Sequence, residues 1–126
     1  MSASAASDAT PQAHAFVDGM EKRLRLVAAQ AKAGRDVSKL RTSQHAAVMA
    51  ELSSMSLGTD DATFISIKTT ELSWTEPQKD SLLQAIIEAA SRSGGRKGTR
   101  MNQTITTLHS YVLRKDLAAY RDPICP

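Results

Sequence analysis

Residues 11–34 read PQAHAFVDGMEKRLRLVAAQAKAG, and this stretch predicts the first helix of a helical hairpin. Thr10 is a suitable cap and Pro11 suits the first helical position, where its missing N–H is not needed. Gly34 predicts the end of the helix, and Gly19, inside it, predicts a close contact with another helix. Apolar side chains recur at steps of three and four and share one helical face: Phe16, Met20, Leu24, Val27 and Ala31.

The segment after Gly34 predicts a second helix, with Asp36 as its cap and Gly58 as its end. Its stripe again has helical spacing, interrupted by one polar residue: Val37, Leu40, Gln44, Val48, Leu52 and Met55. Because the connection over residues 33–36 is short, the two helices should be antiparallel neighbours. We therefore expect a helical hairpin over residues 11–57.

Two further helices are expected beyond this hairpin. Residues 75–78 read TEPQ, a capping box, and the apolar positions that follow predict a helix ending near Ser93. Residues 101–112 also show helical spacing, although their threonines weaken that prediction. For residues 59–74 we favour a short helix or an irregular packing segment, with Trp74 in the core. A strand over 63–69 paired with one over 103–113 is the α/β alternative.

These patterns predict an all-α fold: a small bundle of about four helices, made of an antiparallel helical hairpin and two further helices. The chain has 126 residues and only 4% aromatic residues, so the core should be aliphatic. We expect a flexible N-terminal tail over residues 1–9, a single helical domain over 10–121 and an irregular C-terminal end over 122–126.

Several classes of function lack support in the sequence. The single cysteine, Cys125, allows no intrachain disulfide, and no apolar run approaches the roughly 20 residues of a membrane span. The three histidines, His14, His45 and His109, show no metal-ligand spacing, and no catalytic motif is present. We therefore expect a cytoplasmic or nuclear protein that is not an enzyme, with no metal, cofactor, small-molecule substrate or membrane partner.

The positive charge near the C-terminal end of the chain suggests a site for an anion. Residues 1–75 hold eight cations and eight anions, whereas residues 89–115 hold six cations and no acid. Glycine lets backbone N–H groups approach phosphates, and the cations supply charge. The candidate nucleic-acid or anion-binding residues are Arg92, Gly95, Arg96, Lys97, Gly98, Arg100, Arg114 and Lys115.

Residues 95–98 have the form Gly-x-x-Gly, which resembles the backbone-clamping loop of KH RNA-binding domains. The resemblance covers these four residues, and we do not assign the family. It implies contact with an RNA or DNA backbone through loop 92–100. The competing interpretation is that the glycines permit a turn and the cations keep it solvated.

The sequence thus favours a non-enzymatic helical binding module that contacts nucleic-acid phosphates through the basic Gly-rich loop. The first alternative is a protein-interaction or oligomerisation module, in which hairpin 11–57 pairs with a helical partner or with a second copy of the chain. A further alternative is that the chain is a segment of a larger protein.

Overall fold

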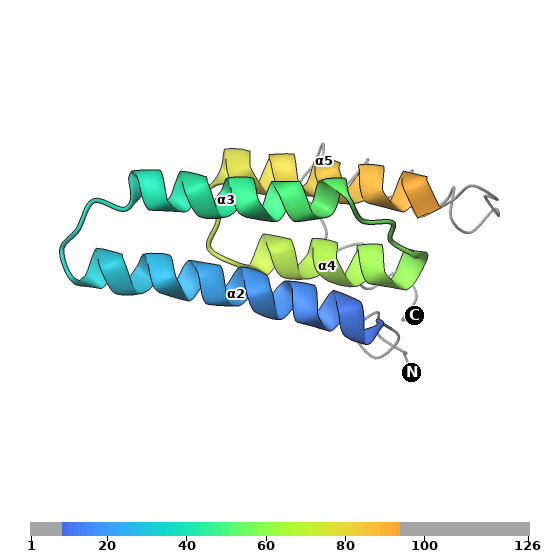
Figure 1. Cartoon of the computed structure of the whole chain (residues 1–126), viewed down its shortest axis with the longest axis horizontal. Coiled ribbons are helices and arrows are strands. Elements are labelled where there is room, and N and C mark those ends of the chain that lie inside the picture. The colour runs from blue at the N-terminus through green and yellow to red at the C-terminus, as the bar shows by residue number, and fades with distance from the viewer. Residues whose placement is uncertain (1–8, 94–126) are drawn as a thin grey trace, which may run out of the picture.

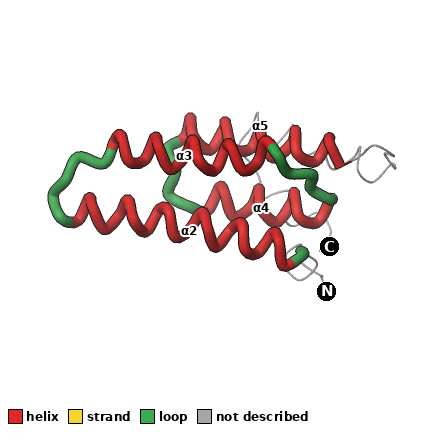
Figure 2. The backbone as a smooth tube through the Cα atoms, in the orientation of Figure 1, coloured by secondary structure: helices red, strands yellow, loops and turns green. Residues whose placement is uncertain are grey.

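A computed structural model describes residues 9–93, which fold into four helices: α2 (Pro11–Lys32), α3 (Ser38–Ser53), α4 (Thr59–Glu71) and α5 (Glu76–Ser93). Helices and their connecting loops are the only elements of this part of the chain (Figure 2). The predicted all-α fold is confirmed, and residues 63–69 are helical rather than extended. The predicted helix over 101–112 and the alternative strand over 103–113 lie outside the described residues.

The four helices form a ring in which each packs on two others. Helix α2 contacts α3 and α4, and α5 contacts the same two helices from the other side. The antiparallel pair α2 and α3 forms the predicted hairpin (Figure 1). Their connection extends past the α4–α5 connection at the left of Figure 1, so one end of the hairpin projects from the bundle.

Each helix contributes aliphatic side chains to one shared core. From the first predicted stripe Phe16, Met20, Leu24 and Val27 are buried, whereas Ala31 is exposed. Helix α4 is buried over almost its whole length, and α5 buries its Leu and Ile residues. Trp74 is buried as expected, with its ring at 5.7 Å from the ring of His45 in an edge arrangement.

The first turn of α4 holds the start of α2. Thr10 caps α2, because its hydroxyl oxygen accepts a hydrogen bond of 3.3 Å from the backbone N–H of Ala13. The Asp61 carboxylate in turn accepts from the backbone N–H of Thr10 at 2.8 Å and from its hydroxyl at 2.7 Å. The predicted cap is confirmed, and it is anchored by a side chain far away in sequence.

The hairpin connection depends on Gly34, which has a φ of +84°. Backbone N–H groups of Gly34 and Arg35 close the last turn of α2 on the carbonyls of Ala31 and Gln30, at 2.9 and 3.2 Å. The Asp36 carboxylate then accepts from the backbone N–H and the hydroxyl of Ser38, at 3.0 Å each. The turn is therefore closed from both sides by hydrogen bonds.

Three details differ from the sequence prediction. Asp36 supplies the capping carboxylate, but Val37 occupies the N-cap position of α3. Helix α3 ends at Ser53 rather than at Gly58, which instead caps the start of α4. Gly19 makes no close helix contact, since a Cβ built on it would meet nothing within 4 Å.

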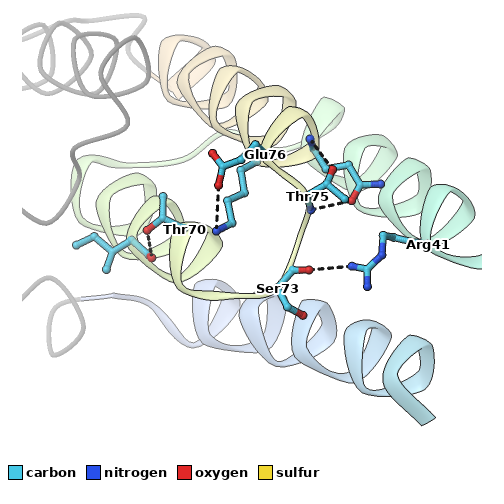
Figure 3. Close-up of polar contacts among 8 residues, drawn as sticks. Arg41, Thr70, Ser73, Thr75 and Glu76 are labelled. Carbon is cyan, nitrogen blue, oxygen red and sulfur yellow. Dashed lines mark hydrogen bonds and ion pairs between the residues drawn. The ribbon is translucent and has the colours of Figure 1, made fainter. Parts of the chain in front are cut away.

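The α4–α5 connection is tied to α3 (Figure 3). The Arg41 guanidinium donates a 2.8 Å hydrogen bond to the backbone carbonyl of Ser73. The predicted capping box is confirmed: Thr75 N–H donates to the Gln78 side chain at 3.2 Å, and Gln78 N–H donates to the Thr75 hydroxyl at 3.3 Å. In the described part of the chain, no helix is long and apolar enough to cross a membrane.

Candidate functional site

The projecting end of the hairpin has no core of its own. Val27 and Val48 are buried, but none of the twenty residues from 28 to 47 is. Val37 and Leu40, which the stripe predicted in the core, are only half-buried. This end of α2 and α3 therefore contributes little to the packed interior and presents its side chains to solvent.

The largest concentration of positive charge in the described part of the chain covers this end together with the preceding turns of α2. Seven of the sixteen Lys and Arg residues lie between positions 22 and 41, and Asp36 is the only acid in that span. Within the span, five cations are exposed; we call these the basic tip: Lys22, Arg25, Lys32, Arg35 and Lys39. The whole chain has a formal charge of +3, so this span of +6 is balanced by net negative charge elsewhere.

The other two cations of the span, Arg23 and Arg41, brace the hairpin. The Arg23 guanidinium donates to the Gln44 side chain at 2.7 Å and pairs with the Glu51 carboxylate at 3.4 Å, which joins α2 to α3. Arg41 holds the carbonyl of Ser73, as described above. Both are partly buried, whereas the basic tip is exposed.

Most of the basic tip is unengaged. Among residues 9–93, the side chains of Lys22, Arg25, Lys32 and Lys39 form no hydrogen bond or ion pair, and Arg35 bonds only the neutral side chain of Gln30. The charge of these groups is therefore not cancelled by a carboxylate within the described fold. Lys22, Arg25 and Lys32 follow at steps of three and seven, which keeps them on one side of α2.

The one acid of the span is held in the connection between the helices. Asp36 is fully exposed, and its bonds with the backbone N–H and the hydroxyl of Ser38 lower the pKa of its carboxyl below the usual value. It therefore stays ionised at neutral pH and subtracts one charge from the tip.

One large hydrophobic side chain is exposed in the described part of the chain. It belongs to Leu26, which is 45% exposed and follows Arg25 in the sequence.

Of the eight residues predicted to bind an anion, the described part of the chain contains only Arg92. Its guanidinium donates to the backbone carbonyls of Met55 and Leu52, at 2.8 and 2.5 Å, and so satisfies the C-terminal end of α3. The remaining predicted residues lie outside the described residues: Gly95, Arg96, Lys97, Gly98, Arg100, Arg114 and Lys115. Their role stays a prediction.

Arg92 and the basic tip lie at opposite ends of the bundle. Helix α3 begins near the tip and ends where Arg92 contacts it, as Figure 1 shows for α3 and α5. Its 16 residues correspond to about 24 Å. The structure thus separates Arg92, which holds a helix end, from five exposed cations that the search for a basic loop did not select.

The basic span does not stand out in the total charge of residues 1–75. Cations and anions are equal in number there, because the acids lie mainly before and after the span. A window of twenty residues moved along the same sequence isolates positions 22–41, so the signal was present. Helical geometry also places Lys22, Arg23 and Arg25 mainly off the apolar stripe of the first helix.

Two other features of the described residues bear on function. No cluster of three or more His, Cys, Asp or Glu side chains within residues 9–93 could hold a metal ion. An open groove lies between the start of α2 and the end of α3, lined by Gln12, Ala15, Phe16, Glu51, Ser54 and Met55. No Lys or Arg is among these lining residues, and the groove is remote from the basic tip.

Comparison of the chain with family models, curated proteins and solved structures finds no match.

Proposed function

We propose that the protein is a non-enzymatic helical module that binds the phosphate backbone of nucleic acid, with the basic tip as its main contact surface. The observation that carries the proposal is the set of exposed cations on the projecting hairpin end and the adjacent turns of α2. The side chains of Lys22, Arg25, Lys32 and Lys39 pair with no acid among residues 9–93. A surface of this kind attracts a polyanion at long range.

The physical basis of such binding is the release of counterions. Each phosphate that a Lys or Arg neutralises frees condensed cations from the nucleic acid, which favours complex formation most strongly at low salt. Because the tip offers charge rather than a groove or a set of amide side chains, binding should depend little on base sequence. The affinity should instead fall steeply as salt is added.

A membrane surface is the less favoured polyanion. A helix that lies on a bilayer needs a broad apolar face opposite its basic one. Here the only large hydrophobic side chain exposed among residues 9–93 is Leu26, while the other apolar residues of α2 face the core or are alanines. A surface with so little exposed apolar area is better suited to a nucleic-acid backbone than to the interface of a lipid bilayer.

The predicted basic loop would provide a second contact in this proposal. The first two residues of loop 92–100 form the end of α5, and this end of the helix lies at the end of the bundle remote from the tip. Two separate groups of cations could engage one long polyanion at two places, or two different segments of it. Since Arg92 already bonds backbone carbonyls, the charge of the loop would come mainly from Arg96, Lys97 and Arg100.

The test is a titration of the full chain against fluorescent oligonucleotides at 50 mM salt. The tip variant Lys22→Gln/Lys39→Gln removes two exposed cations, one from each helix of the hairpin. The matched control, Lys68→Gln/Lys79→Gln, makes the same chemical change at α4 and α5, where the lysines pair only with nearby Glu71 and Glu76 at 3.5 and 3.9 Å. Both pairs are partly open to solvent, so each should contribute little to stability.

The proposal expects the tip variant to lose about tenfold or more in affinity, because each phosphate contact contributes about one unit of salt slope, while the control changes far less. Equal losses in both variants would show that only net charge matters. No binding of the wild-type chain at 50 mM salt would refute the proposal.

The alternative, a protein-interaction or oligomerisation module, is favoured by a different observation. The hairpin has two surfaces that a protein partner could cover. Leu26 is exposed on the second half of α2, and the open groove beside Phe16 and Met55 lies between the start of α2 and the end of α3. Light scattering over a hundredfold range of concentration tests self-association. A mass that rises with concentration, and falls back in Leu26→Gln, would support it; a constant monomer mass would count against it.

A further inference from the structure

We infer that the basic tip selects double-stranded over single-stranded nucleic acid, an inference that rests on the proposed function and names its ligand class. Three properties of the hairpin lead to it: the absence of stacking side chains at the tip, the fixed positions of the cations, and their separation along and between two helices.

The tip has no side chain on which an unpaired base could stack. No aromatic residue occurs between positions 22 and 41. The aromatic residues of the described part of the chain, Phe16, Phe64 and Trp74, are buried in the core. Proteins that prefer single strands gain much of their affinity from bases stacked on exposed aromatic rings. The tip can offer only charge, together with the aliphatic Leu26.

The helix backbones hold the Cα positions of most tip cations in place. Lys22, Arg25 and Lys32 project from the continuous helix α2, and Lys39 projects from the first turn of α3. Gly34 and Asp36 close the connection with hydrogen bonds, and Arg23 braces the two helices through Gln44. A rigid protein surface binds a stiff ligand with a smaller loss of conformational entropy, because neither partner has to become ordered.

The higher charge density of duplex DNA also favours it over a single strand. Duplex DNA carries one charge per about 1.7 Å of axis, and its salt slope is about −0.9 per phosphate contact, against about −0.7 for a single strand. For four contacts, and equal affinity at 1 M salt, these slopes correspond to about a tenfold preference for the duplex at 50 mM salt. Helix α2 places Arg25 and Lys32 about 10 Å apart along its axis, so they can reach different phosphates.

The experiment compares three labelled ligands with the same number of phosphates at 50 mM salt: a DNA duplex, a thymine single strand and an abasic single strand. The full chain and the variants Lys22→Gln/Lys39→Gln and Lys68→Gln/Lys79→Gln are titrated against each. The abasic strand keeps the phosphates and removes the bases, so it separates charge from base contacts.

We expect the duplex to bind about tenfold more tightly than either strand, and the two strands to bind alike. The preference should shrink in Lys22→Gln/Lys39→Gln and persist in the control. A thymine strand that binds as well as the duplex, or better than the abasic strand, would overturn the inference while leaving the proposed function intact. A preference that survives in the tip variant would assign selection to another surface and also overturn it. Failure of all three ligands to bind would remove the proposed function itself.

Discussion

The carboxylate of Asp61 accepts two hydrogen bonds from Thr10, one from its backbone N–H at 2.8 Å and one from its hydroxyl at 2.7 Å. Asp61 lies in the first turn of α4 and Thr10 caps α2, so one side chain fixes the starts of two parallel neighbours. Positive ends of helix dipoles meet there, and a carboxylate suits both. The contact joins residues 51 positions apart.

Replacing Asp61 should destabilise the bundle. In Asp61→Ala the N–H and hydroxyl of Thr10 lose a charged acceptor in a partly buried position, where Asp61 itself is only 8% exposed. We expect the free energy of unfolding to fall by about 2 kcal/mol, typical of hydrogen bonds to a charged group. Urea denaturation followed by circular dichroism measures this. The exposed Asp18→Ala in α2 is the control, and a similar small change in both variants would contradict the assigned role.

Arg92 should matter for stability because its guanidinium satisfies the carbonyls of Leu52 and Met55 at the end of α3. We expect Arg92→Ala to lose about 1–2 kcal/mol of unfolding free energy, and Arg92→Lys to recover only part of it, since an ammonium lacks the planar fork of donors. The measurement is again urea denaturation. Unchanged stability in Arg92→Ala would show that this arginine is free for another partner.

The carboxyl of Asp36 should make stability depend on pH in the acid range. Its pKa is lowered in the folded protein by the hydrogen bonds from Ser38, so it stabilises the hairpin above the pKa of the unfolded chain. That contribution is lost as the pH falls through the lower folded pKa, below about 4. The thermal midpoint of Asp36→Ala should therefore decline less than that of the wild type between pH 5 and pH 3. Parallel declines would contradict this.

Removing the acid from the basic tip should strengthen binding to a polyanion. Asp36 lies between Lys32 and Lys39, and Asp36→Asn deletes its charge while keeping an oxygen that can accept from Ser38. We expect duplex affinity to rise by about two- to threefold at 50 mM salt, the scale of one exposed charge. Fluorescence anisotropy would detect it, and a lower affinity in this variant would conflict with charge-driven binding at the tip.

The helices were predictable from sequence because capping and periodicity are local. Thr10 with Pro11, Gly34 and the Thr75–Gln78 box all act within a few residues, and each has its predicted role. Residues 59–71 were harder, because Thr63, Ile65 and Ile67 are β-branched and favour strands locally. Burial on two sides against α2 and α5 overrides that preference, and this is a property of the whole bundle.

The candidate site was less predictable. Spacing alone could not show that burial stops at Val27 and resumes at Val48, because the stripe continues through Val37 and Leu40. Nor could it show that Arg23 and Arg41 bond neighbouring elements while Lys22 and Arg25 stay unengaged in the described fold. The difference between bracing and exposed cations depends on which helix lies beside each one. Arg92, selected from sequence as a phosphate contact, bonds α3 for the same reason.

The dependence of duplex affinity on salt tests the central claim most directly. Anisotropy titrations between 50 and 200 mM salt give the slope of log affinity against log salt, which counts the phosphates neutralised. For Lys22→Gln/Lys39→Gln we predict a slope shallower than the wild type by about 2, and for Lys68→Gln/Lys79→Gln an unchanged slope. A wild-type slope near zero, or the same slope in the wild type and the tip variant, would contradict binding through the basic tip.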